Sequence, residues 1–246
     1  MQSMLHIISK ILIGGLILFP SYIIALVPDA TIYGPIVTEP HPSLNSIYSA
    51  SAIELTDKGY IEEEYFIEGT ANRYSSAEME NSEIIDSGHR YKTRLIVRRP
   101  QGAENFNGVV VVEWINVTGG ADKDIDWWQS GHHFVRNGYA FVAVSAQQMG
   151  IDTMKEWSQE RYGSLDTTHD GIVSGDALSY DIFSAVGKTI NRIGETTANG
   201  GVDILGGLKA EMILATGHSQ SASRLAIYLN NVHPLEPVYD LSLIHI

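Results

Sequence analysis

The sequence predicts an α/β protein built on a doubly wound, mostly parallel sheet. Three apolar runs have the composition of strands that are buried on both faces: Val109 to Trp114 (VVVVEW), Tyr139 to Ala146 (YAFVAVSA) and Ala210 to Ala215 (AEMILA). Segments with helical periodicity separate these runs. Strands that alternate with helices of this length are joined by right-handed parallel crossovers, which place helices on both faces of one sheet.

Two earlier segments predict a hairpin that opens the sheet. Glu64 to Gly69 and Thr93 to Arg99 (TRLIVRR) alternate or run apolar as strands do, and Pro100 ends the second. The turn signal Asn107-Gly108 then precedes the first buried strand. We therefore expect the hairpin to pair first and the parallel strands to follow it.

Three helices and one long loop complete the predicted order. Trp127 to Asn137 has helical spacing and closes at Gly138, a residue type that is favoured just after a helix end. A loop rich in charged and aromatic residues is predicted from Gln147 to Ser174. A crossover helix is predicted over Asp176 to Ile193, and a last helix over Ala222 to Asn231.

The composition excludes several classes of protein. The 246 residues include 16 Lys and Arg against 29 Asp and Glu, a net charge of −13, which opposes binding to nucleic acids and to anionic membrane surfaces. A hydrophobic share of 44% with 18% charged residues excludes global disorder. Because the chain has no cysteine, disulfides, thiolate metal sites and cysteine nucleophiles are excluded.

The first 25 residues have the pattern of an export signal. Lys10 precedes the apolar run Ile11 to Leu26, which contains a Gly-Gly pair and a proline, and Ala25 is the predicted cleavage point. A membrane-spanning helix needs roughly 20 apolar residues and rarely contains such breaks. We expect export with cleavage and no stable membrane span afterwards; the alternatives are an uncleaved membrane anchor or a buried N-terminal element.

The opposite end of the chain differs from the rest. After Asp240, residues 241–246 (LSLIHI) show no turn, cap or strand partner in the sequence pattern. We therefore expect a truncated or non-native tail and a sheet that is incomplete on its C-terminal side. The third buried strand would then form an unpaired edge.

The segment Thr216 to Ser221 (TGHSQS) lies between the third buried strand and the last helix. A strand, a sharp turn with small residues and a helix are the setting of the G-x-S-x-G elbow, which presents a nucleophilic serine above a sheet. Ser219 holds the nucleophile position, while Ser221 replaces the second glycine. The alternative is that Ser219 only caps the helix.

A nucleophile that attacks a carbonyl needs N–H donors for the oxyanion that forms. The main-chain N–H of Gln220 begins the last helix, where the helix dipole adds positive potential. The second donor is expected from the loop after the first buried strand, which starts Asn116-Val117 and ends Gly119-Gly120. The alternative for this loop is an ordinary glycine-rich turn.

Long runs of the sequence resemble an alpha/beta hydrolase domain family of serine-hydrolase-like, mostly exported proteins. The resemblance covers residues 33–240, the N-terminal portion of a single domain, and is carried by HRYKTRLIVRRP (His89 to Pro100), FNGVVVVEWINVTGG (Phe106 to Gly120), GYAFVAVSAQ (Gly138 to Gln147), ERYGSLD (Glu160 to Asp166), SYDIFSAVG (Ser179 to Gly187) and ATGHSQSASRLAIYLN (Ala215 to Asn230). It implies an α/β-hydrolase fold, Ser219 as nucleophile, and an oxyanion hole from Gln220 with Asn116 and Val117. Hydrolysis of a small-molecule carboxylic ester is the implied activity.

The acid and the histidine of a catalytic triad follow the serine in this fold. The downstream candidates are His233, Glu236, Asp240 and His245. His233 is expected to end the last helix away from the serine, and His245 belongs to the unusual tail. His218 is expected to point into the fold. We therefore predict that this chain lacks its acid and base and is inactive, while its longer parent is a hydrolase.

Two other functions remain open from the residues alone. The first is a non-catalytic binding protein on a hydrolase scaffold. The second is a metal enzyme that uses His132-His133 and His169-Asp170, although no H-x-x-x-H or H-E-x-x-H spacing supports it, so no metal is expected. Without a glycine-rich phosphate-binding motif, no nucleotide cofactor is expected. Glu113, inside a buried strand, is interpreted as a structural partner.

Overall fold

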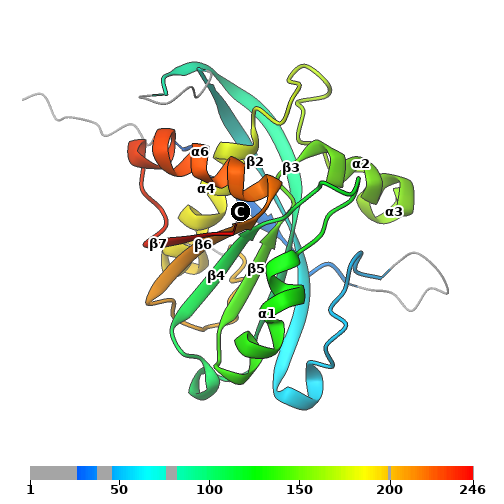
Figure 1. The fold of residues 1–246 in the computed structure, drawn as a ribbon, viewed down its shortest axis with the longest axis vertical. Helices are drawn as coiled ribbons and strands as arrows, with labels where there is room; N and C mark the ends of the chain where they lie inside the picture. The colour runs from blue at the N-terminus through cyan, green and yellow to red at the C-terminus, as the bar shows by residue number, and fades with distance from the viewer. Residues whose placement is uncertain (1–26, 38–45, 76–81, 199–200, 246) are drawn as a thin grey trace, which may run out of the picture.

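A single seven-stranded sheet organises the protein (Figure 1). The structure is a computed structural model that describes residues 27–37, 46–75, 82–198 and 201–245. The strands are β1 (Thr31–Tyr33), β2 (Tyr60–Tyr74), β3 (Ile84–Pro100), β4 (Val109–Trp114), β5 (Ala140–Val144), β6 (Met212–His218) and β7 (Leu241–His245).

The strand order β1-β2-β3-β5-β4-β6-β7 gives a mixed sheet. Strands β1, β2 and β3 pair antiparallel, β3 pairs antiparallel with β5, and β5, β4, β6 and β7 are mutually parallel. The predicted mostly parallel, doubly wound sheet is therefore confirmed. Because Trp114 at the end of β4 pairs with Gly217 of β6, the segments that follow these two strands emerge side by side.

Helices cover both faces of the sheet. They are α1 (Ile125–Arg136), α2 (Gln148–Trp157), α3 (Gln159–Tyr162), α4 (Ser179–Asn191), α5 (Ile193–Ala198) and α6 (Gln220–Asn231), with short 3₁₀ turns at Thr56–Lys58, Ala103–Asn105 and His233–Leu235. On one face, Trp127 of α1 packs with Val111 and Phe141. On the other face, α4 and α6 pack against the alternate side chains of the same strands, among them Trp114. The crossover helices and the last helix occur where they were predicted.

The predicted loop from Gln147 to Ser174 is wrong in its first half, which forms α2 and α3. Two apolar side chains of α2, Ile151 and Met154, are three residues apart and fully buried in a cluster with Tyr162. Helix α2 adds only Trp157 to this apolar face, and α3 has four residues in all, so charged neighbours interrupt both short segments. The sequence of this segment therefore shows too few turns of helical periodicity to predict a helix.

The predicted hairpin exists and is much longer than its apolar cores. Strands β2 and β3 pair from Tyr60↔Pro100 as far as Tyr74↔Ile84. Only Leu95 to Arg98 of β3 pair with β5. The rest of the hairpin, here called the arm (Phe66–Tyr74 with Ile84–Arg94), projects beyond the edge of the sheet at which the parallel strands end (Figure 1). Many residues of the arm are polar, so its sequence did not predict that the two strands extend this far.

A buried carboxylate fastens the arm to α4. Asp181, in the first turn of α4, accepts the main-chain N–H of Asn72 at 2.7 Å and the hydroxyl of Tyr74 at 2.5 Å. Burial raises the pKa of Asp181 to about 6. The native state therefore favours the protonated carboxyl, and the free energy of unfolding falls as the pH rises from about 4, the unfolded value, through about 6.

We expect Asp181→Asn to remove this dependence on pH. An amide is isosteric with the carboxyl group and carries no charge, so the variant should match the wild type near pH 4. Near pH 7 it should be more stable by about 3 kcal/mol, the free-energy equivalent of the pKa shift. Urea unfolding at the two pH values gives the double difference, which cancels the titration of all other groups. An equal difference at both pH values would contradict the prediction.

The expectation for the end of the chain is wrong in one respect. Residues Leu241–His245 form β7, which pairs in parallel with β6 in the register Leu214↔Leu241 to His218↔His245. Strand β6 is thus an inner strand, and β7 is the outer strand of the described sheet. The alternation Leu-Ser-Leu-Ile-His is short enough to be read either as a strand or as an unstructured end, and the strand partner decides between them.

The predicted export signal, residues 1–25, lies outside the described residues. Among the helices that the structure describes, none combines the length and apolar character that crossing a membrane requires.

Candidate active site

Ser219 occupies a strained corner between β6 and α6. Its backbone angles, φ 55° and ψ −113°, are disfavoured for a residue with a side chain. The strand ends at His218 and the helix begins at Gln220, so the turn consists of Ser219 alone. Ser219 is exposed while the residues on both sides are partly covered. The corner therefore holds the serine hydroxyl outside the packed sheet.

Small residues on both sides of Ser219 make the corner possible. A Cβ on Gly217 would lie 3.1 Å from the main-chain carbon and oxygen of Ser221, so a larger residue here would push the helix slightly away from the strand. Ser221, which replaces the usual second glycine, is fully buried. Its hydroxyl accepts the N–H of His218 and donates to the carbonyl of the same residue, both at 3.0 Å. The serine at this position thus adds two hydrogen bonds across the turn.

The segment between β4 and α1, here called the β4–α1 loop (115–124), is attached to this corner. The side-chain amide of Asn116 donates to the carbonyl oxygen of His218 at 2.7 Å. Asn116 and Lys123 exchange two main-chain hydrogen bonds that close the base of the loop, and Gly120 N–H donates to Val117 O at 2.9 Å across its tip. The loop and the serine corner are therefore one connected unit.

The available N–H donors differ from the prediction at one residue. The main-chain N–H of Asn116 donates to Lys123 O at 3.1 Å, so the geometry does not support Asn116 as a main-chain oxyanion donor. Asn116 instead ties the loop to the corner through its side chain. Among the described residues, no hydrogen-bond partner faces the main-chain N–H of Val117 or of Gln220. These two donors stay free for a ligand, as a first-turn N–H of a helix ordinarily does.

Glu113 has the structural role that the sequence favoured. It is fully buried in β4 and accepts the main-chain N–H groups of Asp126 at 3.1 Å and Trp127 at 3.4 Å, in the first turn of α1. Burial raises the pKa of Glu113 well above its usual range, and the neighbouring Asp126 raises it further. The carboxyl group joins the start of α1 to the strand that leads into the β4–α1 loop.

Asp126 joins α1 to the strand that carries the serine. Its Oδ2 accepts the hydroxyl of Thr216 at 2.6 Å, and its Oδ1 lies 3.6 Å from Nδ1 of His218. The imidazole of His218 therefore faces α1 on one side of the sheet, as expected for a strand residue whose neighbour forms the corner. The imidazole thus lies on the α1 side of the turn.

The other downstream candidates lie in structural contacts. Nε2 of His233 accepts the main-chain N–H groups of Val238 and Tyr239 at 3.1 Å, and burial lowers the pKa of His233. Glu236 pairs with Lys188 at 3.2 Å. Asp240 accepts the N–H of Ile213 at the start of β6, at the opposite end of the strand from Ser219. The side chain of His245 lies outside the described part.

The aromatic side chains of α1 and α3 differ in their burial. Trp127 and Tyr162 are buried in the core, and Trp128 is 57% exposed on α1. Within the described residues, no group of three or more His, Asp or Glu side chains is placed to hold a metal ion.

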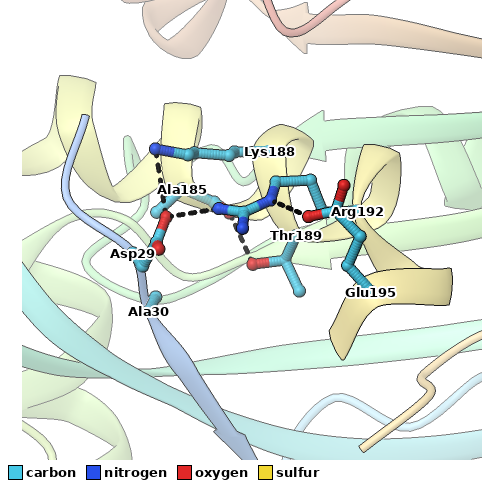
Figure 2. A pocket seen from close by; sticks show the side chains of 7 residues that line it. All are labelled: Asp29, Ala30, Ala185, Lys188, Thr189, Arg192 and Glu195. Carbon is cyan, nitrogen blue, oxygen red and sulfur yellow. Dashed lines mark hydrogen bonds and ion pairs between the residues drawn. The ribbon is translucent and has the colours of Figure 1, made fainter. Parts of the chain in front are cut away.

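A small pocket at the C-terminal end of α4 contains ion pairs. Lys188 and Arg192 both point at Asp29, at 3.1 and 2.7 Å (Figure 2). The volume of about 180 Å³ is below the range of about 300 to 1,000 Å³ that is usual for ligand sites. Lys188 also donates to the carbonyl of Val27 at 2.5 Å. We therefore assign these residues to the attachment of the N-terminal segment to α4.

Two buried arginines near the β4–α1 loop were missed by the sequence analysis. Arg94 and Arg98 of β3 are fully buried and pair with Asp122 and Asp124 of the loop. The sequence signal was two arginines inside an apolar strand, at the same face, which a buried strand tolerates only when each charge has a partner.

Comparison with solved structures finds distant matches. Oligopeptidase B from Trypanosoma brucei aligns with a TM-score of 0.38 and 11% identity over 75% of this chain and 20% of that chain. For the rice cell wall degrading esterase LipA from Xanthomonas oryzae the values are 0.36 and 10%, over 88% and 48%. For a glucuronoyl esterase from Solibacter usitatus they are 0.35 and 12%, over 81% and 51%. The chain thus spans at most about half the length of these proteins.

Comparison with curated proteins finds no match. A family model described as an alpha/beta hydrolase domain matches residues 32–246, from the first strand of the sheet to the last. That span contains the strand order, the serine corner and the β4–α1 loop described above. The protein therefore belongs to the alpha/beta hydrolase domain family and has the α/β-hydrolase fold.

Proposed function

We propose that the protein is a serine hydrolase that cleaves small-molecule carboxylic esters, with Ser219 as nucleophile. The observation that carries this proposal is the exposed, strained corner of Ser219, to which Asn116 ties a loop with an unoccupied N–H at Val117. Strain at a single exposed polar residue is characteristic of functional sites. The oxyanion hole in this proposal consists of the main-chain N–H groups of Gln220 and Val117.

In the proposed reaction, Ser219 Oγ attacks the ester carbonyl while a general base takes the hydroxyl proton. The carbonyl oxygen becomes an oxyanion that accepts hydrogen bonds from Gln220 and Val117. Collapse of this intermediate expels the alcohol, which takes the proton back from the base, and leaves an acyl group on Ser219. Attack by water, in the same sequence of proton transfers, releases the carboxylic acid and restores the serine.

We place the general base and its acid in polypeptide outside the described residues. The downstream groups His233, Glu236 and Asp240 have partners away from Ser219, and His218 faces α1. A triad serine without its histidine retains only the contribution of binding and of the oxyanion hole.

We also propose that the protein is exported and that residues 1–25 are removed on the way. The support for this is the apolar leader followed by Ala25. After cleavage, the small-molecule substrate would be met outside the cytoplasm.

Covalent labelling tests the nucleophile. We expect a fluorophosphonate probe to modify Ser219 in the full-length protein encoded by the gene, because the corner exposes the hydroxyl and the two N–H groups bind the phosphonyl oxygen. Peptide mapping by mass spectrometry locates the adduct. Ser223→Ala is a matched control, since Ser223 is exposed one turn further along α6.

The labelling result separates this proposal from a non-catalytic binding protein. An adduct at Ser219 that persists in Ser223→Ala and disappears in Ser219→Ala supports the hydrolase. Full-length protein that stays unlabelled at Ser219, under conditions that label a known serine esterase, would overturn the proposal in favour of a binding scaffold.

A further inference from the structure

Two arginines enter the interior from the same face of β3. Arg94 and Arg98 are four residues apart on a strand, so their side chains lie on one face, and both are less than 2% exposed. Nη2 of Arg94 lies 2.9 Å from Oδ2 of Asp122. Nη1 of Arg98 pairs with Oδ2 of Asp124. Both carboxylates belong to the β4–α1 loop, so the strand holds this loop by two buried ion pairs.

The pairs are embedded in further contacts that leave them little freedom. Nε of Arg94 donates to the hydroxyl of Ser145 at 3.0 Å, and that hydroxyl donates to Asp122 at 2.5 Å. Nε of Arg98 donates to Glu62 at 2.6 Å, and its guanidinium lies 4.5 Å from the ring centre of Trp127. Each aspartate is therefore fixed by a cation that is itself held on other sides.

The two buried ion pairs contribute more to the position of the β4–α1 loop than to the stability of the fold. Burial raises the pKa of both Asp122 and Asp124, although the paired arginines act in the opposite direction. Within the described residues, Oδ1 of each aspartate is buried without a hydrogen-bond partner. Buried ion pairs of this kind recover much of their desolvation cost but seldom add net stability, whereas their geometry is strict.

Helix α2 holds the same loop from the other side. A Cβ on Gly150 would come within 1.7 Å of Oδ1 of Asp122, so the helix backbone packs directly on that carboxyl group. The hydroxyl of Thr153 donates to the carbonyl of Gly120 at 2.5 Å. The tip of the loop is thus bonded to α2 while its far end is bonded to β3.

We propose that Asp122, Asp124 and Thr153 are positioning residues that hold the β4–α1 loop so that the N–H of Val117 stays beside Ser219. This inference rests on the proposed function, because it concerns the same oxyanion. The loop closes on itself through Asn116 and Lys123, so any movement of its distal half moves the turn that begins at Val117.

A positioning role has a kinetic signature that differs from a loss of stability. The oxyanion exists only in the transition state and in the intermediates, so a misplaced donor lowers kcat and leaves KM nearly unchanged. Complete removal of one such donor costs about 100- to 1,000-fold in kcat. Displacement of Val117 N–H by a loosened loop should cost less, about 10- to 100-fold.

The test uses the full-length protein with p-nitrophenyl acetate. We expect Asp122→Asn to lower kcat about 10- to 100-fold with KM within about twofold, since a neutral amide loosens the pair with Arg94 but fills the same volume. Thr153 is half-buried, and Thr153→Val removes the hydroxyl that bonds Gly120 O and, within α2, Met149 O at 3.1 Å; it should lower kcat several-fold. Thr153→Val keeps the proposal testable if Asp122→Asn does not fold.

Glu63→Gln is the matched control for loss of an ion pair on β3. Glu63 pairs with Arg99 at 2.9 Å, and the other side-chain hydrogen bonds of the two residues within the described part go to Tyr65 and Ile204, outside the β4–α1 loop. Hydrogen exchange should show faster exchange at Asn116 and Lys123 in Asp122→Asn, and wild-type exchange in Glu63→Gln.

The outcomes distinguish this inference from the proposed function. Lower kcat with faster loop exchange in Asp122→Asn or Thr153→Val, but not in Glu63→Gln, supports the positioning role. Unchanged kcat in both loop variants, or an equal loss in Glu63→Gln, overturns it while the hydrolase proposal stands. A wild-type protein that neither turns over the ester nor reacts at Ser219 overturns the proposed function itself.

Discussion

Replacement of Ser219 by alanine should abolish ester hydrolysis by the full-length protein, with kcat reduced by about 10⁴- to 10⁶-fold. The variant lacks the oxygen that forms the acyl intermediate, so only binding and the two N–H groups at Val117 and Gln220 remain to stabilise the transition state. The fold should be unaffected, because the Ser219 side chain makes no capping hydrogen bond to α6. Initial rates with p-nitrophenyl acetate measure the loss.

Two comparisons make this result specific. Ser223→Ala, which removes an exposed hydroxyl from the same helix, should retain wild-type turnover. The 246-residue chain should hydrolyse the ester only at the background rate, because the proposal places the base and the acid in the longer parent protein. Turnover by that chain that disappears in Ser219→Ala would refute the location of the base. Full activity of Ser219→Ala in the full-length protein would refute the nucleophile.

The sequence predicted the sheet because its central strands are buried on both faces. Both ends of strand β4 (Val109–Trp114) were predicted correctly, because a β-branched run after Asn107-Gly108 has no competing interpretation. The sequence did not predict the helix and the strand that form because of contacts with distant parts of the chain. Strand β7 is defined by its pairing with β6, and α2 by two side chains that face a distant part of the hairpin. Such contacts leave no local periodicity for a single sequence to show.

In the candidate site, too, the local features could be predicted from the sequence and the long-range contacts could not. The corner at Ser219 could be predicted because it is a local structure, formed by adjacent small residues between a strand and a helix. The bond from Asn116 N–H to Lys123 O, which removes Asn116 as a main-chain donor, could not be predicted because it depends on a loop closure that the sequence does not show. The pairing of Arg94 and Arg98 with aspartates requires the strand order, which places β3 and the β4–α1 loop on one face.

Loss of the carboxylate of Glu64 should strongly destabilise the interior. Glu64 is buried on β2 and binds Arg161 through Nε at 2.7 Å and the hydroxyl of Tyr162 at 2.8 Å, with Arg94 3.8 Å away. Glu64→Leu removes a buried carboxylate that both guanidinium groups contact, while Arg94 keeps Asp122. Breaking a buried pair in this way costs about 3 to 5 kcal/mol, which urea unfolding followed by tryptophan fluorescence measures.

We expect the cost to come mainly from the buried positive charge that Glu64 no longer balances, and less from the lost attraction. A second substitution separates these two contributions. Arg161→Met combined with Glu64→Leu removes both charges, so the double variant should recover most of the lost stability even though the ion pair is gone. Asp170→Asn, which removes the partner of Arg90 in a pair that is about 70% exposed, should leave the unfolding free energy unchanged. If the double variant were less stable than Glu64→Leu, the attraction itself would be the larger contribution.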